Sequence, residues 1–426
     1  MPLVPIRLVS FAALGLAMPL AAQVIPPVRA DHPALKAALA TIQRDNAWTI
    51  EQQVSICEIP APPFKEEKRG LEMKRRFEQL GLANVRVDSI GNVVGEYIGT
   101  QSGPTVVLAA HLDTVFPEGV DVQVSRTGTQ MKGPGIGDDC RGLATILAVA
   151  RAMRQSKVPT QGTILFVANV GEEGPGNLRG VRYLFKHPPR PIDYFISVDG
   201  TGLGLATGGV GSNRYKVSFR GPGGHSYGAF GMPSPIHALG RAIAKIAEIR
   251  VPTSPKTTFN VGVIEGGTSV NTISPLGAMD VDLRSESADE LAKLDAMFRR
   301  AVADALKEEN DRWPNSSVKV TVDIEDRGVR PASVRRDDSI IARVASGAGQ
   351  ALGFTPEMGA GSTDANIPMS MGLQAVTMDG GGQGKGAHST AESYDDGARG
   401  YLGPQWVALV VSSLAGLPGG SARPIP

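Results

Sequence analysis

The chain has 426 residues, and its Lys and Arg side chains nearly balance its Asp and Glu side chains, for a formal net charge of +1. This length exceeds what one small core requires and indicates more than one domain. Because the charge is balanced and no long basic run occurs, nucleic acid and anionic membrane surfaces are excluded as expected partners. The 52 glycines gather around acidic residues and histidines, which indicates a site built from loops.

Residues 1–22 have the pattern of a secretory signal peptide, with Arg7 before a short apolar stretch and small residues at its end. The stretch is short for a membrane span, and Pro19 interrupts it. A retained N-terminal anchor is the alternative. Cleavage would give a periplasmic or secreted protein with no membrane attachment. Cys57 and Cys140 are too few for a disulfide framework, so we expect two buried thiols and leave their pairing open.

Residues 30–209 alternate apolar strands with helices and form the first part of a predicted catalytic domain. The strands are nearly continuous apolar runs, which is typical of a sheet covered by helices on both faces. The predicted strands are 84–88, 92–99, 105–115, 162–170 and 193–200, and the predicted helices lie within 23–63 and at 66–82, 141–155 and 180–185.

The pattern changes at about residue 210, and residues 210–327 have the order β-α-β-β-α-β of a ferredoxin-like domain. Its elements are predicted at 213–221, 235–249, 257–267, 277–285, 289–306 and 318–326. Residues 328–418 then resume the first pattern, with helices at 338–352 and 401–417 and a strand at 375–379. The sequence therefore predicts a discontinuous α/β domain with a small domain inserted, followed by a loose tail at 419–426.

Imidazole and carboxylate side chains follow the predicted strands or lie in adjoining loops: His111 and Asp113, Asp138 and Asp139, Glu172 and Glu173, Asp199, and His388. Sites in open α/β sheets form at the carboxyl ends of strands, so we expect these side chains to converge. Two divalent cations with a bridging carboxylate would make such crowding favourable. Nitrogen and oxygen ligands without a thiolate suit zinc, with cobalt or manganese as alternatives.

The neighbouring glutamates can divide the work at such a centre. One can bind metal while the other stays free as a general base for water. Asp113 follows His111 by two positions on the same strand face, so its carboxylate can fix the tautomer of that imidazole.

Nine motifs in a fixed order carry a resemblance to a known family. They are HLDTV, GPGIGDD, GEEG, SVDG, GPGGHS, GGTSVNTIS, DLR, GSTDAN and AHSTAE, between about residues 40 and 415. Together they resemble the co-catalytic dizinc exopeptidases, which include peptidase T, glutamate carboxypeptidase, aminoacylase and succinyl-diaminopimelate desuccinylase. The resemblance implies a mixed-sheet catalytic domain covered by helices, with the inserted domain as a lid that also forms a homodimer.

The resemblance also implies a role for each candidate residue. His111 and Asp199 would hold one zinc, Glu173 and His388 the other, and Asp138 would bridge the two ions through a loop with a cis Asp138–Asp139 peptide. Glu172 would be the general base, and Asp113 the partner of His111. His225 would stabilise the oxyanion, commonly in the partner subunit's site, while Asn271 and Arg284 would bind substrate. Ser362 and Thr363 are carried over as pocket residues.

The residue at the ligand position of Asp199 favours one activity within the family. Members with Asp there, as at Asp199, tend to be amino-, di- or tripeptidases, whereas Glu is typical of carboxypeptidases and deacylases. We therefore expect a zinc-dependent aminoexopeptidase acting on small peptides. The alternatives are a carboxypeptidase, an N-acyl-amino-acid deacylase and a non-catalytic peptide-binding relative. A serine hydrolase is also considered, because GHSYG at 224–228 matches the nucleophile-elbow pattern, although turn-forming residues flank it.

Overall fold

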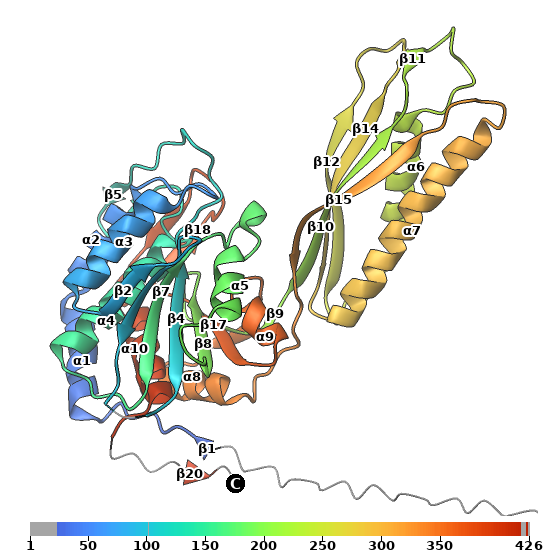
Figure 1. Cartoon of the computed structure of the whole chain (residues 1–426). Coiled ribbons are helices and arrows are strands. Elements are labelled where there is room, and N and C mark those ends of the chain that lie inside the picture. The colour runs from blue at the N-terminus through green and yellow to red at the C-terminus, as the bar shows by residue number, and fades with distance from the viewer. Residues whose placement is uncertain (1–23, 101, 419–422, 425–426) are drawn as a thin grey trace, which may run out of the picture.

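The computed structural model describes residues 24–100, 102–418 and 423–424, so the expected signal peptide at 1–22 lies outside the described residues. The chain forms two bodies joined at a narrow waist: a large sheet covered by helices and an elongated second domain (Figure 1). None of the helices in the described ranges is both long enough and apolar enough to cross a membrane.

An eight-stranded mixed sheet forms the centre of the larger domain, in the order β16-β9-β17-β8-β4-β7-β3-β2. The four central strands β17, β8, β4 and β7 are parallel, while β9, β3 and β2 run antiparallel to their inner neighbours. The bounds are β2 Ala83–Val87, β3 Val93–Tyr97, β4 Thr105–His111, β7 Thr163–Asn169, β8 Tyr194–Val198, β9 Gly204–Gly209, β16 Glu357–Gly361 and β17 Gln374–Met378. This arrangement confirms the predicted mixed α/β fold.

Helices cover both faces of this sheet, which explains why its strands are apolar without interruption. Alternate residues of β4 point into two different cores. Val106, Leu108 and Ala110 pack in the core shared with α1, α3, α4, α8 and α10. Val107 and Ala109 pack in the core on the other face, which is shared with α5 and α9. The bounds are α1 Pro33–Arg44, α3 Glu67–Gln79, α4 Cys140–Gln155, α5 Arg179–Lys186, α8 Ile340–Ala351, α9 Asn366–Ser370 and α10 Leu402–Ala415. Helix α2, Asn46–Cys57, packs on the outside of α4.

Short elements tie together loops that are distant in the sequence. Strands β5 (Ser125–Thr127), β6 (Gln130–Lys132), β18 (Gln383–Lys385) and β19 (Ser393–Asp395) form a small sheet in the order β18-β19-β6-β5. Because β6 pairs with β19, the loop before α4 lies beside the loop that carries His388. The described part of the predicted tail, β20 (Arg423–Pro424), pairs antiparallel with β1 (Val24–Ile25).

The inserted domain has the predicted ferredoxin-like order, with its sheet arranged β12-β14-β10-β15. Tyr215, Val217 and Phe219 on one face of β10 form its core with α6 and α7, as their alternation predicted. The bounds are β10 Gly211–Arg220, β11 Gly224–His225, α6 Pro235–Ala247, β12 Thr257–Gly266, β13 Thr272–Ile273, β14 Leu276–Ser285, α7 Ala288–Arg312 and β15 Thr321–Arg330. Strand β15 therefore continues past the predicted boundary at residue 327.

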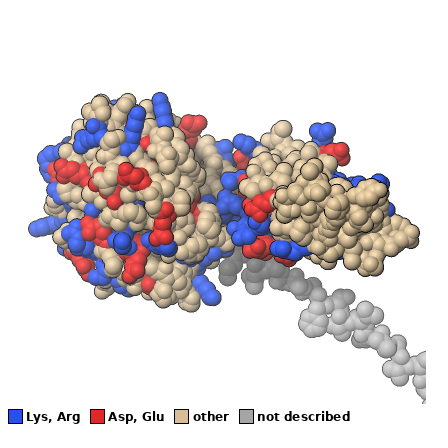
Figure 2. Space-filling view, turned by 90° about the horizontal axis from the view of Figure 1, so that it is seen from above, with Lys and Arg blue, Asp and Glu red and all other residues tan. Residues whose placement is uncertain are grey.

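The chain enters and leaves the inserted domain at one place. Ser212 near the start of β10 pairs with Arg330 at the end of β15, and Gly209 forms a bridge with Ser333 just beyond. Figure 2 shows Lys and Arg side chains gathered where the two domains meet. The waist between the domains is thus a two-stranded connection, with Lys and Arg side chains on the face seen in Figure 2.

Candidate metal centre

The predicted ligands converge at the carboxyl ends of the parallel strands. His111 is the last residue of β4 and lies in register with Asn169, the last residue of β7, while β8 ends just before Asp199. The Glu172–Glu173 pair follows β7 after Val170 and Gly171. One edge of the sheet therefore receives an imidazole and several carboxylates, as the strand-end positions predicted.

Two groups of three ligands share Asp138. His111, Asp138 and Asp199 form one group and Asp138, Glu173 and His388 the other, with the ligand atoms of each group within 4.8 Å of one another. The His111 Nε2 atom lies 3.0 Å from Asp138 Oδ1. The His388 Nε2 atom lies 3.1 Å from Asp138 Oδ2 and 3.0 Å from Glu173 Oε1. This is the bridged arrangement expected for two cations.

The charges of the centre fit bound cations. Burial and the neighbouring Asp138 carboxylate raise the pKa of Asp199 to about 7. Hydrogen bonds to Asp138 and Glu173 raise the pKa of His388 to about 10. In the metal-free protein, bound protons thus offset the charge of the crowded carboxylates. Divalent cations would displace these protons and offset the same charge. The donor set of imidazole nitrogens and carboxylate oxygens fits zinc, cobalt or manganese.

The loop before α4 presents Asp138 through a network that the sequence did not reveal. The Asp138–Asp139 peptide is cis, as the resemblance implied. Asp139 caps α4 by accepting a hydrogen bond from the Gly142 N–H at 3.0 Å, and it also accepts one from the His111 N–H at 2.9 Å. The buried Glu392 carboxylate accepts hydrogen bonds from the N–H groups of Gly135, Gly137 and Asp138 at 2.8–3.0 Å. The only signal for Glu392 was its place at the end of the AHSTAE motif.

Asp113 contacts the site differently from the expectation. The nearest acceptor to His111 Nδ1 is the backbone carbonyl of Asp113, at 3.0 Å, whereas the carboxylate oxygen is 3.7 Å away. The carboxylate instead accepts hydrogen bonds from the backbone N–H groups of Glu172 and Glu173, at 3.0 and 2.9 Å. Although burial raises the pKa of Asp113, the His111 imidazole and these N–H groups hold it below its usual value. Asp113 therefore orients both His111 and the glutamate pair.

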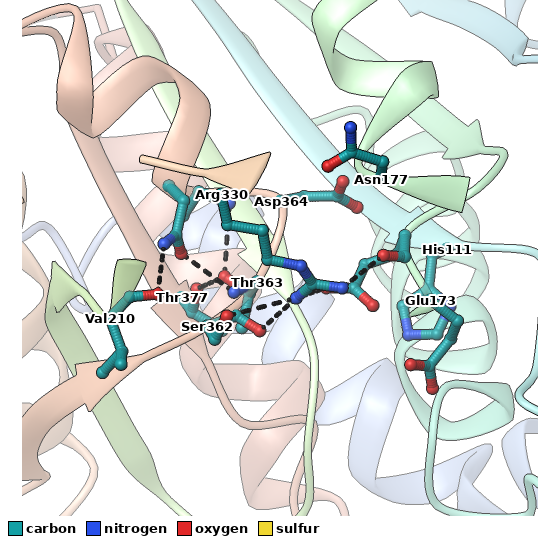
Figure 3. Close-up of polar contacts among 12 residues, drawn as sticks. His111, Glu173, Asn177, Val210, Arg330, Ser362, Thr363, Asp364 and Thr377 are labelled. Carbon is teal, nitrogen blue, oxygen red and sulfur yellow. Dashed lines mark hydrogen bonds and ion pairs between the residues drawn. The ribbon is translucent and has the colours of Figure 1, made fainter. Parts of the chain in front are cut away.

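Arg330 contacts the candidate base and was missing from the sequence-based set. Its guanidinium donates from Nη1 to Glu172 Oε1 at 2.8 Å and from Nη2 to the Glu172 carbonyl at 2.6 Å (Figure 3). Both side chains are only 5% exposed. Burial raises the pKa of Glu172, and Arg330 opposes that rise. Because Arg330 ends the last strand of the inserted domain, it links that domain to the candidate base.

The loop after β16 lies beside the same arginine. The Ser362 carbonyl and hydroxyl accept from Arg330 Nη1 at 2.8 and 3.3 Å. Thr363 shares a hydroxyl hydrogen bond of 2.6 Å with Thr377 (Figure 3), and Asp364 accepts one of 2.6 Å from Asn169. The two predicted pocket residues thus lie next to the centre, within a wider polar network.

Two of the predicted residues of the inserted domain, His225 and Asn271, lie apart from the metal centre of this chain (Figure 1). His225 in β11 and Asn271 lie close to each other at the outer end of that domain, where the Ser226 N–H donates to the Asn271 carbonyl at 2.9 Å (Figure 1). Arg284 lies near the other end of β14 and pairs with Asp282 at 2.6 Å. Asp282 lines a cleft of about 530 Å³ that also contacts Gly174.

The serine-hydrolase alternative lacks its structural context. Ser226 follows the two-residue strand β11 and is followed by turns, so the strand–turn–helix of a nucleophile elbow is not formed. Cys57 and Cys140 are both buried and free.

Comparisons with known proteins agree with this geometry. Residues 107–401 match the family model described as peptidase family M20/M25/M40. The sequence is 23% identical over 351 residues to the uncharacterised protein YqjE of Bacillus subtilis, covering 77% of this chain and 89% of that protein. It is 27% identical over 265 residues to carboxypeptidase G2 of a Pseudomonas species, covering 59% of this chain and 61% of that protein.

Solved structures show the same fold. A tripeptidase from Staphylococcus aureus superposes with a TM-score of 0.72 at 21% identity, and aminopeptidase PepT from Bacillus cereus with 0.69 at 21% identity. Each comparison covers 86% of this chain and 98% of the solved chain. The resemblance inferred from the motifs is confirmed: the chain belongs to the peptidase family M20/M25/M40.

Proposed function

We propose that this protein is an aminoexopeptidase that uses two divalent cations, zinc by preference, to hydrolyse the amide bond of small peptides. The observation that carries the proposal is the pair of ligand groups sharing Asp138, with the buried Glu172 carboxyl directly beside them. The cations, when bound, would polarise the substrate carbonyl and lower the pKa of the attacking water. Family membership supports a peptide hydrolase, and Asp199 as third ligand favours the aminopeptidase over the carboxypeptidase and deacylase alternatives.

The protein's own groups would carry the proton and orient the substrate. Glu172 would accept the proton from the attacking water and pass it to the leaving amine. Arg330 holds the Glu172 backbone and carboxylate, and Asp113 fixes its N–H, so the base is anchored from two sides. His225 would stabilise the oxyanion from a partner subunit, because it lies far from the centre of its own chain (Figure 1).

The adjacent glutamates provide a matched test. Glu172→Gln should keep two metal equivalents per chain and lose roughly 10²–10⁴-fold in kcat, since the proton acceptor is removed while the residues of both ligand groups are kept. Glu173→Gln should lose affinity for one of the metals. Metal content by mass spectrometry and hydrolysis of free, N-acetylated and C-amidated peptides would be measured for both variants. Normal turnover in Glu172→Gln would refute the assignment, and binding without hydrolysis by the metal-loaded wild type would favour the non-catalytic alternative.

A further inference from the structure

A cavity of about 640 Å³ adjoins the metal centre, and the proposed function makes no use of most of it. Asp199 and Thr363 lie in its wall, together with strands β9 and β16, Thr377 and Asp379. Its link to the centre follows from the sheet: Val198 and Met378 are paired in parallel register at the ends of β8 and β17, and Asp199 and Asp379 are the residues that follow them. A group bound in this cavity would therefore sit beside a ligand of the metals.

The walls of the cavity are small, neutral residues and carboxylates. Most of the lining is Gly, Ala, Thr, Leu and Met, and the hydroxyls of Thr363 and Thr377 meet there at 2.6 Å (Figure 3). The charged residues of the lining are Asp199, Glu357 and Asp379, and no Lys, Arg or His belongs to it. Because bound metal would neutralise Asp199, the net charge left for a ligand comes from the other two carboxylates.

The glycine-rich segment after β8 packs closely against the Asp379 side chain in the wall of the cavity. Its Oδ2 atom accepts a hydrogen bond from the Gly204 N–H at 2.7 Å. A Cβ atom at Gly200, Gly202 or Gly204 would lie 2.9 Å from one of the Asp379 carboxylate oxygens, so a larger residue at these positions would force the Asp379 side chain to shift. One N–H donor satisfies only part of the capacity of a carboxylate, which offers about four lone-pair sites. Burial, together with the neighbouring Glu357, raises the pKa of Asp379 to about 6, in spite of the Gly204 N–H.

We propose that this cavity binds a cationic group of the substrate, either the α-ammonium of the first residue or a Lys or Arg side chain, with Asp379 as its counter-ion. The inference rests on the proposed function, since it specifies which end or side chain of the peptide lies beside the metals. A cavity of this size accommodates an amino-acid residue, because ligand pockets typically span about 300–1,000 Å³. An anionic group would meet two carboxylates without a cation among the lining residues and is disfavoured there.

The test uses direct binding, so that it is independent of turnover. Metal-loaded Glu172→Gln protein would be titrated calorimetrically with three probes: alaninamide, N-acetyl-lysinamide and N-acetyl-alaninamide. These carry an α-ammonium, a side-chain ammonium and no charge, respectively. Adding Asp379→Asn should weaken binding of one cationic probe about 10- to 100-fold, because a hydrogen-bonded charge pair is lost. The cationic probe that responds identifies the source of the cation. The neutral probe should change less than about twofold.

Controls separate this inference from the proposed function. Asp121→Asn, in an exposed loop away from the cavity, should leave all three affinities unchanged. Asp379→Asn keeps the shape of the side chain and an oxygen for the Gly204 N–H, and thermal unfolding would verify its stability. The inference would be overturned if Asp379→Asn left the affinities for both cationic probes unchanged, or if it weakened binding of the neutral probe as much as binding of the cationic probes. Either result would count even if the wild type hydrolyses peptides. Failure of the wild type to hydrolyse any peptide would refute the proposed function alone.

Discussion

Replacing Arg330 by Met tests whether this arginine holds the candidate base in place. Methionine keeps a long apolar stem but removes the guanidinium, so the bonds to the Glu172 carboxylate, the Glu172 carbonyl and the Ser362 carbonyl are all lost. The Glu172 side chain is 5% exposed and cannot recover those contacts from water without a rearrangement of the loop. Arg330→Lys restores the charge without the planar fork and should recover only part of the effect.

The expected cost follows from burial. Removing one partner of a buried ion pair leaves the other charge unpaired and destabilises a protein by about 3–5 kcal/mol. Arg335→Met is a matched control, because Arg335 pairs with Asp337 at 2.7 Å in the same segment, but both side chains are more than 40% exposed. An exposed pair of this kind contributes roughly 0–1 kcal/mol. The two variants remove the same chemical group and differ mainly in desolvation.

The free energy of unfolding would be measured by urea titration of the metal-free protein, because bound cations would offer Glu172 a second positive neighbour. Metal content and kcat of the metal-loaded variants would be measured in parallel. We expect Arg330→Met to retain its metals, unfold at lower urea than Arg335→Met and turn over more slowly. A difference in unfolding free energy below about 0.5 kcal/mol between the two variants would contradict the role given to the buried contact.

Three further predictions concern the metal ligands and the inserted domain. Glu392→Gln should weaken metal binding about 10–100-fold in a chelator competition assay, because it loosens the loop that presents the bridging carboxylate. In the metal-free protein, the raised pKa values of Asp199 and His388 favour the protonated forms in the folded state. The stability contributed by protonated Asp199 is fully present below about pH 3.8 and is lost as the pH rises through about 7. The stability contributed by protonated His388 is fully present below about pH 6.5 and is lost as the pH rises through about 10. Unfolding of the metal-free protein at pH 9 should therefore need less urea than at pH 6, and this difference should be small after metal loading. If His225 acts on a partner's site, unfolding the His225→Ala and Glu172→Gln variants together and then refolding the mixture should restore activity that neither variant has alone. The absence of any restored activity would exclude action across a dimer.

The metal ligands could be predicted because each occupies a strand end or an adjoining glycine-rich loop. Parallel strands bring such positions to one edge of the sheet regardless of their separation in sequence, so the convergence of His111, Asp199 and the glutamate pair could be expected from their joint occurrence. The assignment of Glu173 as a ligand and Glu172 as the base came from the family resemblance. The fold was predictable for a similar reason. Continuous apolar runs predicted strands that are buried on both faces. The alternation of Tyr215, Val217 and Phe219 predicted that the sheet of the inserted domain packs its core on one face.

Arg330 and Glu392 could not be predicted in this way. Arg330 reaches Glu172 from 158 positions along the chain, and Glu392 reaches Gly135 from 257, so neither contact leaves a local pattern. The second contact of the Asp113 carboxylate could not be predicted, because strand periodicity gives the face of a side chain but not every donor that it meets. This carboxylate lies 3.7 Å from the His111 ring and also accepts hydrogen bonds from the backbone of Glu172 and Glu173.

The paired crossing at Ser212 and Arg330 makes the inserted domain modular. Since its first and last strands are hydrogen-bonded neighbours, the larger domain holds this whole insertion as it would hold a single hairpin loop. Another domain with adjacent termini, or a short turn, could take its place without moving any strand of the eight-stranded sheet. Exchange of that module would change what surrounds Arg330 and Glu172, while the cluster of ligands stayed as it is.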